Sequence, residues 1–439
     1  MRKQRISEKL RTYAKEHLSP TETERRFVSR VYAAVCAVIG VDNALQIGSY
    51  PRFTAIRPLH DLDVLYILGA WNPQEHDPST ALRDLEQRLL NEFENPMSHR
   101  VTIELQTHSV TIRLLDGDEE VFAVDVVPAY SHRRNDRGED MYVVPEIARA
   151  SHSERRRIRV AVARGEREMT WIPSDPRGYI SVARDVNAAN TDFRKAVKIV
   201  KGWRAACKRQ DDNFALKSFH LEQAITRWVT RHPQSDIFDM VYAFFCDLPD
   251  LIRYPQIPDR ADPSRNIDDY ISGLTEQERR QILEARDGFL IALENLGEAD
   301  SILGLLEAPR RRRAGPSEAY LFDQRIPVFA EYEFSIVATA LERQGSFRRF
   351  ILDIIGKISV DRAIEFRLGR DAPEADLFKW KVKNDDAASQ PRGEITDHGT
   401  LRDPEHTKFR GHHHVECFAI RDGICIGRTR QNVVLDAVW

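Results

Sequence analysis

Long hydrophobic runs are missing from this chain of 439 residues. The longest apolar stretch extends from Val31 to Val41, far short of the ~18–20 residues that a transmembrane helix requires. The first residues, Met-Arg-Lys-Gln-Arg, are polar and do not resemble a secretory signal peptide. We therefore expect a cytoplasmic protein without a membrane partner.

Cysteine is scarce, and its pattern excludes two common kinds of small fold. The odd number of cysteines, without any CxxC pair, predicts neither a disulfide framework nor a zinc ribbon. A reducing compartment is expected, in agreement with a cytoplasmic location. The five positions are Cys36, Cys207, Cys246, Cys417 and Cys425.

An excess of charge of one sign is also absent. The chain has 65 Lys and Arg residues against 68 Asp and Glu residues, which gives a net charge of −3. This balance does not favour a long nucleic acid as substrate, so a site for polyanions would have to be a local basic pocket. The 42% of hydrophobic and 30% of charged residues are typical of globular proteins. The length is sufficient for two or three domains.

The first part of the chain alternates between helical and strand-like patterns. Apolar residues recur at helical spacing through the first forty residues, and Thr80–Phe93 is a second helix candidate. Four segments predict strands, and short polar turns between the last three indicate an antiparallel meander. The four segments are Asp63–Leu68, Arg100–Leu105, Val110–Leu115 and Glu120–Val127.

The rest of the chain predicts a helical part followed by a small β-rich part. We expect a lobe with an N-terminal helix and a mixed sheet over residues 1–160 and a helical lobe over 161–308. A linker and one helix, over Glu333–Gln344, are expected within 309–345, and a β-rich domain over 346–439. The basic run Arg310–Arg313 is expected to be an exposed linker. The predicted fold class is therefore α+β.

Three acidic residues are the strongest indication of chemistry. Asp61 and Asp63 are two residues apart on a predicted strand, so both side chains leave the same face, with Cα atoms about 6.5–7 Å apart. Asp125 lies within the apolar strand Val121–Val127, where an acid is costly unless it is paired or metal-bound. If the two strands are neighbours, the three carboxylates converge. Carboxylates without His or Cys favour Mg²⁺ or Mn²⁺ over zinc.

A Gly-Ser pair, Gly48-Ser49, precedes the acids. Glycine permits close approach of the backbone to a phosphate, and the serine hydroxyl and nearby N–H groups supply donors. A phosphate cradle beside a carboxylate metal site is the minimal equipment for nucleotidyl transfer. Each signal is weak by itself, but their order and spacing together are considerably more specific.

A helix is predicted around Lys201, and its basic residues share one face. From Arg194 to Lys208 the basic residues follow one another at intervals of four, three, three and four residues, which aligns them along one face of a helix. Val197, Val200 and Cys207 lie on the other face. Without context, a solvated basic face is the simpler interpretation; beside a metal–triphosphate site, a lysine would neutralise phosphates. The aligned residues are Arg194, Lys198, Lys201, Arg204 and Lys208.

The order Gly48-Ser49, Thr54, Asp61-x-Asp63, with Asp125 in a later strand, resembles the DNA polymerase β-like nucleotidyltransferase superfamily. Within it, the chain is similar to the bacterial cGAS/DncV-like nucleotidyltransferases, also called the SMODS or CD-NTase family, and to the oligoadenylate synthases. Segments 193–204 and 216–222 resemble the two triphosphate-facing helices of that family. The resemblance covers roughly residues 20–300, and departs from the family at Phe53, where glycine is usual.

The resemblance implies a site between a sheet lobe and a helical lobe. Asp61, Asp63 and Asp125 would be catalytic and would hold two Mg²⁺ or Mn²⁺ ions, with Asp125 orienting or deprotonating the attacking hydroxyl. Phe219 would stack on the donor base, which does not reveal the base because every base has a π-face. The donor triphosphate would be held by Gly48, Ser49, Lys201 and Ser218.

The function implied by this resemblance is the synthesis of short oligonucleotide second messengers from nucleoside triphosphates, ATP among them. The product would be a cyclic di- or trinucleotide that acts on a downstream effector protein in antiphage signalling of the CBASS type. One alternative is a nucleotidyltransferase that makes linear oligonucleotides or extends RNA or DNA ends. Another is an inactive nucleotide-binding sensor, against which the three intact acids argue.

The C-terminal part carries a resemblance of its own. Segments 380–384, 392–395, 410–417 and 423–427 resemble the AGS-C domain, a small module found behind nucleotide cyclases and SMODS nucleotidyltransferases. The resemblance implies a sensor-like domain. Residues 378–383, 415–420 and 424–427 are expected to be short strands.

Overall fold

The computed structural model describes residues 2–146, 169–297, 299–307, 318–341, 349–351, 357–360, 362–385, 392–397, 405–406 and 408–436. The chain forms two compact units: residues 5–282, and residues 283–439 together with 1–4. The basic run 310–313 lies outside the described residues. No described helix is both long and apolar enough to cross a bilayer.

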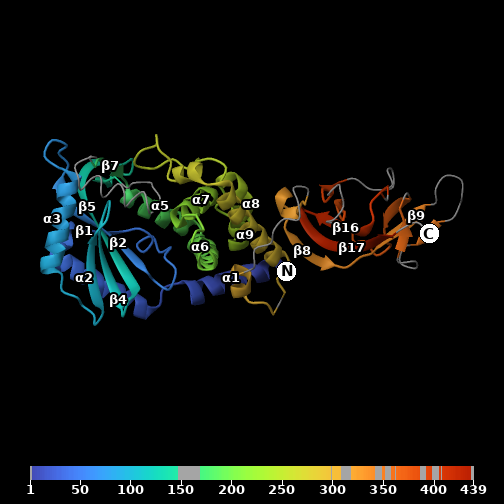
Figure 1. Cartoon of the computed structure of the whole chain (residues 1–439), viewed down its shortest axis with the longest axis horizontal. Coiled ribbons are helices and arrows are strands. Elements are labelled where there is room, and N and C mark those ends of the chain that lie inside the picture. Colours follow the sequence, from blue (N-terminus) through green and yellow to red (C-terminus); the bar gives the residue numbers. More distant parts are fainter. Residues whose placement is uncertain are drawn as a thin grey trace. The chain divides into compact units, whose positions relative to one another are not determined.

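The larger unit begins with helices and continues into a mixed sheet, as the sequence predicts (Figure 1). Thr21 caps the second helix in a reciprocal pair with Glu24. The predicted helix over Thr80–Phe93 is confirmed within one or two residues. The elements are α1 (Arg2–Tyr13), α2 (Glu22–Ile39), β1 (Ala44–Ile47), β2 (Asp61–Ala70), α3 (Pro78–Glu92), β3 (Arg100–Leu105), β4 (Val110–Asp116), β5 (Glu119–Arg134), β6 (Asp140–Pro145) and β7 (Trp171–Ser174).

The order of strands in this sheet places the two acidic strands side by side. The described strands run β1-β2-β5-β4-β3, and β6 joins β5 and β7. Strands β3, β4 and β5 are antiparallel neighbours, so the predicted meander is confirmed. Strand β2 pairs with β5 in parallel, because the chain crosses over through α3 and two further strands between them.

Helices α2 and α3 cover one face of the sheet (Figure 1). Residues at even positions of β2, β4 and β5 face these helices, for example Leu62, Ile112 and Val124, which are almost completely buried. Because side chains alternate along a strand, the odd positions of β2 and β5 leave the opposite face. That face carries the acids.

Among the described residues, the helical part of the larger unit contains four long helices and the first part of a fifth. Helix α6 packs against α7 and α8, while α5 contacts β1, β6 and α7. The core of these helices is aromatic: the ring of Trp203 on α6 meets the rings of Phe214 and Phe245 edge-on. The helices are α5 (Pro176–Ala189), α6 (Phe193–Gln210), α7 (Ser218–Arg231), α8 (Ile237–Leu251) and α9 (Glu276–Glu294).

The smaller unit is β-rich. A sheet of order β10-β9-β12-β15 packs on a sheet of order β11-β17-β16-β13-β14 through a shared core that includes Phe366, Trp380 and Val415; β8 also pairs with β17. The three strands predicted from the sequence are confirmed as β13, β16 and β17. The elements are α10 (Ile302–Leu306), β8 (Val328–Tyr332), β9 (Ile336–Leu341), β10 (Arg349–Ile351), β11 (Lys357–Ser359), β12 (Ala363–Leu368), β13 (Leu377–Lys383), β14 (Ile395–Thr396), β15 (Glu405–His406), β16 (Gly411–Arg421) and β17 (Ile424–Asp436).

The helix expected over Glu333–Gln344 is wrong. Ile336–Leu341 forms strand β9, which pairs with β10 and β12. The segment Ile-Val-Ala-Thr-Ala-Leu contains alanines that favour a helix, but its buried positions Ile336, Ala338 and Ala340 alternate, which is the period of a strand. Pairing with β12 and packing on the second sheet decide its conformation.

Candidate active site

The register between β2 and β5 brings the predicted acids together. Asp63 lies directly opposite Asp125 in the parallel pair, and Asp61 lies two residues earlier on β2. Neighbouring strands are about 4.8 Å apart, so the side chains of Asp63 and Asp125 start from adjacent points on one face. All three acids leave the face that α2 and α3 do not cover.

The environment of the acids opposes their ionisation. Burial raises the pKa of Asp63 to about 7, and the charges of Asp61 and Asp125 add to this shift. Asp61 keeps contact with solvent, but the surrounding protein still displaces water from its carboxylate and, with the charge of Asp125, raises its pKa. Lys201 partly offsets the shift at both residues. The cluster therefore holds negative charge at a cost that a cation would relieve.

Two hydroxyl groups on β4 orient Asp125. Thr111 lies opposite Asp125 in the antiparallel pair and donates a short hydrogen bond to its Oδ1. Ser109 donates a second hydrogen bond to the same oxygen at 3.3 Å. Both hydroxyl residues are buried. The sequence analysis did not identify them; the signal available was a pair of hydroxyl residues two apart on the strand that pairs with the acid.

Gly48 is required where it stands, at the end of β1. Its φ is +75°, and a Cβ built on it would lie 1.8 Å from Oδ2 of Asp63. The carboxylate of Asp63 thus occupies the space of a missing side chain, and the backbone at Gly48-Ser49 approaches the acids closely. This is the arrangement expected from the Gly-Ser pair.

The loop after Ser49 keeps a tight shape although Phe53 replaces the usual glycine. The N–H of Phe53 donates to the carbonyl of Tyr50 at 2.9 Å, and the N–H of Thr54 to the carbonyl of Ser49 at 3.0 Å. Phe53 adopts a left-handed conformation with φ 60°, which costs a non-glycine residue roughly 1–2 kcal/mol. Its ring is 63% exposed and faces the guanidinium of Arg194 at 4.7 Å.

Lys201 does not belong to an open basic face. Its side chain is 5% exposed, and its ammonium donates to Oε2 of Glu222 at 2.6 Å and to the carbonyl of Thr54 at 3.2 Å. Spacing along α6 aligned Lys201 with four other cations but could not reveal a buried acid on α7. Glu222 and its second cation, Arg52, were both missed by the sequence analysis.

The two residues at the start of α7 lie beside this buried network. Ser218 is the first residue of the helix, where backbone N–H groups are unpaired and favour anions. The ring of Phe219 is half-buried between Tyr179, edge-on at 5.1 Å, and the guanidinium of Arg52 at 5.2 Å. Both remain accessible enough to contact a ligand.

The carboxylates of Asp61, Asp63 and Asp125 supply some, but not all, of the ligands that a hard divalent cation needs. The three carboxylates supply oxygen ligands only, repel one another, and are approached by the backbone at Gly48. Within the described ranges, however, no group of three or more acidic, His or Cys side chains is placed so that these side chains alone could hold a metal ion. Further oxygen ligands would have to come from water or from a bound phosphate.

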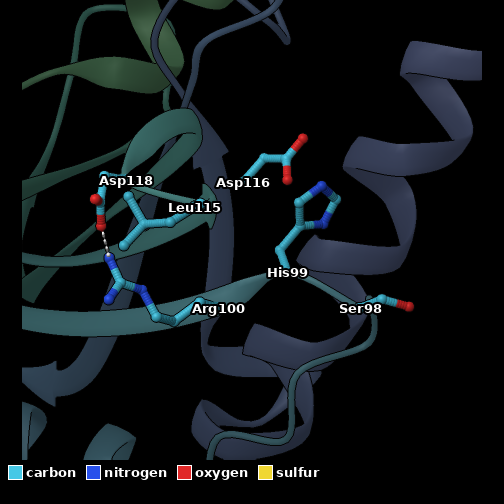
Figure 2. Close-up of a pocket in the computed structure, with 7 residues that line it drawn as sticks. Ser98, His99, Arg100, Leu115, Asp116 and Asp118 are labelled. Carbon is cyan, nitrogen blue, oxygen red and sulfur yellow. Dashed lines mark hydrogen bonds and ion pairs between the residues drawn. The ribbon is translucent and has the colours of Figure 1, made fainter.

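A separate hollow lies at the β3–β4 end of the sheet (Figure 2). Its volume is about 600 Å³, and it is lined by His99, Asp116 and the ion pair of Arg100 with Asp118 at 3.1 Å. Asp118 is 99% exposed and Arg100 60% exposed, so this pair contributes little. Strand β3 forms the edge of the sheet, two strands away from β5. This hollow is therefore distinct from the acidic site.

Comparison with protein families identifies the C-terminal domain. Residues 317–436 match the family described as the adenylyl/guanylyl and SMODS C-terminal sensor domain. The predicted AGS-C domain is thereby confirmed. The match begins before residue 346, in agreement with the position of β8 and β9.

Solved structures with similarity to the chain include nucleotide synthases. E. coli MS115-1 CdnC, in a complex with HORMA-deltaN, is 18% identical over 70% of this chain and 98% of its own, with a TM-score of 0.47. The Elizabethkingia meningoseptica CdnE cyclic dinucleotide synthase, with GTP and Apcpp, is 14% identical over 64% and 96%, with a TM-score of 0.43. The Rhodothermus marinus CdnE c-UMP-AMP synthase is 15% identical over 67% and 99%, with the same TM-score. No curated protein sequence matched the chain.

Proposed function

We propose that this chain is a nucleotidyltransferase of the CD-NTase type that joins nucleoside triphosphates into a short cyclic oligonucleotide. The observation that carries the proposal is the pairing of Asp63 with Asp125 at the place where Gly48 brings the backbone against Asp63. Acids with raised pKa values beside a close backbone approach are suited to a phosphate that arrives with cations.

The proposed reaction needs little covalent chemistry from the protein. A hydroxyl of one nucleotide attacks the α-phosphorus of another, the bond to the pyrophosphate breaks, and the hydroxyl proton is released. Asp125, held by Thr111 and Ser109, is the group proposed to orient this hydroxyl or accept its proton. The backbone at Gly48 and Ser49 and the start of α7 at Ser218 would hold the triphosphate.

Asp61, Asp63 and Asp125 would hold two divalent cations, Mg²⁺ or Mn²⁺. Such ions neutralise the attacking and leaving oxygens of a phosphoryl transfer. The side chains of Lys201 and Arg52 would add positive charge next to the triphosphate, and Phe219 would offer a ring to the donor base. The base itself is not specified by these contacts.

The C-terminal domain supports a role in signalling. The family that it matches is described as the adenylyl/guanylyl and SMODS C-terminal sensor domain. We therefore extend the proposal to an antiphage second messenger that acts on an effector protein, with the AGS-C domain controlling the synthase.

The product distinguishes this proposal from its alternatives. The full chain is incubated with all four nucleoside triphosphates and Mg²⁺ or Mn²⁺, and the products are treated with phosphatase and nuclease before mass analysis. A phosphatase-resistant product supports a cyclic synthase, and a product that loses 5′ phosphates indicates a linear one. The absence of any product, with nucleotide still bound, would indicate a sensor.

The variant Asp61→Ala shows whether the product comes from this site. The loss of several kcal/mol of transition-state stabilisation is expected, since each ~1.4 kcal/mol changes the rate about tenfold. If Asp61→Ala kept turnover within about threefold of the wild type, the assignment of the site would be wrong.

A further inference from the structure

One buried acid in the larger unit has no part in the proposed chemistry. Glu222 lies one turn after Ser218 and Phe219 on α7, and its side chain is completely inaccessible to solvent. It therefore cannot reach a substrate proton or a cation in the acidic site. A buried carboxylate is retained only when its partners compensate for its lost hydration.

Three side chains donate hydrogen bonds to Glu222. The Nε of Arg52 donates to Oε1 at 2.5 Å, the ammonium of Lys201 to Oε2 at 2.6 Å, and the hydroxyl of Thr54 to Oε2 at 2.8 Å. Burial alone would raise the pKa of Glu222, but the charges of Arg52 and Lys201 prevail and lower it to about 2. The carboxylate is thus ionised at physiological pH.

These partners belong to the two parts of the proposed donor site. Arg52 and Thr54 lie on the loop that begins at Gly48-Ser49, and the N–H of Thr54 closes that loop onto the carbonyl of Ser49. Lys201 comes from α6 and also donates to the carbonyl of Thr54. Glu222 is therefore an anion that joins the loop to α6 and to its own helix, α7.

The charges require this anion. Arg52 and Lys201 are 7% and 5% exposed and lie against the same carboxylate. Without it, two like charges would face each other away from water, and at least one side chain would move. With it, each cation has the carboxylate as a hydrogen-bond partner.

The same network reaches Phe219, whose ring is proposed to stack on the donor base. The guanidinium of Arg52 reaches from Glu222 to the ring of Phe219, one turn earlier on the same helix. One face of this ring is thus covered by Arg52, and its edge by Tyr179. A donor base would be left with the remaining face.

We propose that Glu222 is a positioning residue for the donor nucleotide: it fixes Lys201 and Arg52, and through Thr54 the loop of Gly48 and Ser49, in the arrangement that receives the triphosphate. This inference rests on the proposed function. It predicts that Glu222 acts on donor binding, whereas a structural ion pair would act on stability alone.

Asp192 provides a matched control in the same unit. It too is a buried carboxylate held by an arginine and a lysine, Arg11 at 2.7 Å and Lys195 at 3.3 Å. Its hydrogen-bond partners, Arg11, Lys195 and the backbone N–H of Ile237, all lie outside the loop of Gly48–Thr54. Asp192→Asn therefore removes a comparable charge network without touching the donor site.

The experiment compares the full chain with its variants Glu222→Gln, Glu222→Asp and Asp192→Asn. Initial rates are measured against ATP concentration with Mg²⁺, equilibrium binding is measured with inorganic tripolyphosphate and Mg²⁺, and melting temperatures are recorded. For Glu222→Gln we expect the KM for ATP and the Kd for tripolyphosphate to rise at least about tenfold, with kcat within about threefold. Glu222→Asp keeps the charge, so its KM for ATP and its Kd for tripolyphosphate should lie between those of Glu222→Gln and those of the wild type.

Asp192→Asn should lower the melting temperature and leave KM and Kd within about twofold. The inference is overturned if Glu222→Gln behaves like Asp192→Asn, with lower stability and unchanged binding. If Glu222→Gln does not fold, wild-type KM and Kd in the folded Glu222→Asp variant, whose shorter side chain cannot reach all three donors, would overturn it as well. A wild-type chain that neither turns over nor binds tripolyphosphate would instead reject the proposed function, and this inference with it.

Discussion

The carboxylate of Asp63 occupies the space that a side chain at position 48 would need. This contact joins the end of β1 to the acidic strand β2, whose Asp63 pairs with Ile47 in the antiparallel register. The closeness of backbone and acid is a property of the sheet, because it requires the antiparallel pairing of β1 with β2. It also yields a direct test of the site.

Substitution of Gly48 by alanine should abolish most of the activity. The added methyl group would collide with Asp63, and a displacement of catalytic groups by about 1 Å costs roughly a hundredfold in rate. The control is Gly138→Ala, because Gly138 also has a φ of +75° but has no atom near the position of a Cβ. Both variants should lose about 1 kcal/mol of stability, and only Gly48→Ala should lose turnover. Equal turnover in the two variants would contradict the assignment.

Removal of the Thr111 hydroxyl should weaken catalysis without weakening substrate binding. Thr111→Val keeps the shape of the side chain but removes the donor to Asp125. Because a hydrogen bond to a charged group contributes about 1.5–3 kcal/mol, kcat should fall about tenfold or more, with KM nearly unchanged. Steady-state kinetics will test this. Ser109→Ala should lower kcat less, since the hydrogen bond of Ser109 to Asp125 is 3.3 Å long. A larger decrease of kcat in Ser109→Ala than in Thr111→Val would refute the proposed role of Thr111.

The stability of the metal-free protein should fall as the pH rises through the range from about 4 to about 7. In this window the folded protein holds a proton on Asp63, whose pKa is raised to about 7, whereas the unfolded chain, with a pKa near 3.8, has released it. The folded state therefore binds more protons, and the free energy of unfolding decreases with pH by up to a few kcal/mol. Melting temperatures of wild type and Asp63→Asn without divalent cations measure this. The decrease of the melting temperature with pH should be smaller in Asp63→Asn than in the wild type. An equal decrease in both would show that Asp63 is not the group that titrates.

Truncation should reveal the true start of the C-terminal domain. A cut after residue 350, close to the boundary expected from the sequence, leaves β8 without β17 and β9 without β12. Unpaired strands aggregate readily, so the fragment 1–350 should be less soluble than a fragment that ends before residue 318. Expression and size-exclusion chromatography of both fragments provide the measurement. Greater solubility of 1–350 would contradict the pairing of β8 and β9 with the later strands.

Local pattern was sufficient for most of the elements and for the identity of the acids. Alternating apolar residues predict the strands of both units, and an Asp two residues from another on a strand places both on one face whatever the fold. Asp125 was identifiable because an acid within an apolar strand needs a partner. These inferences depend on neighbours in sequence, which the chain itself specifies.

Long-range pairing decided what the sequence could not. Helical spacing aligned Lys201 with other basic residues and the resemblance assigned it to the triphosphate, but the tertiary structure buries its ammonium against Glu222, 21 residues later. Alanines over Ile336–Leu341 favoured a helix, but pairing with β12 makes a strand. In each case the free energy depends on partners distant along the chain: a buried cation needs an anion, and a strand needs a neighbouring strand. The sequence alone thus determined most of the strands and helices and which acids are candidates for the chemistry, and only the fold decided which side chains meet, because hydrogen-bond and charge partners are chosen by packing in three dimensions.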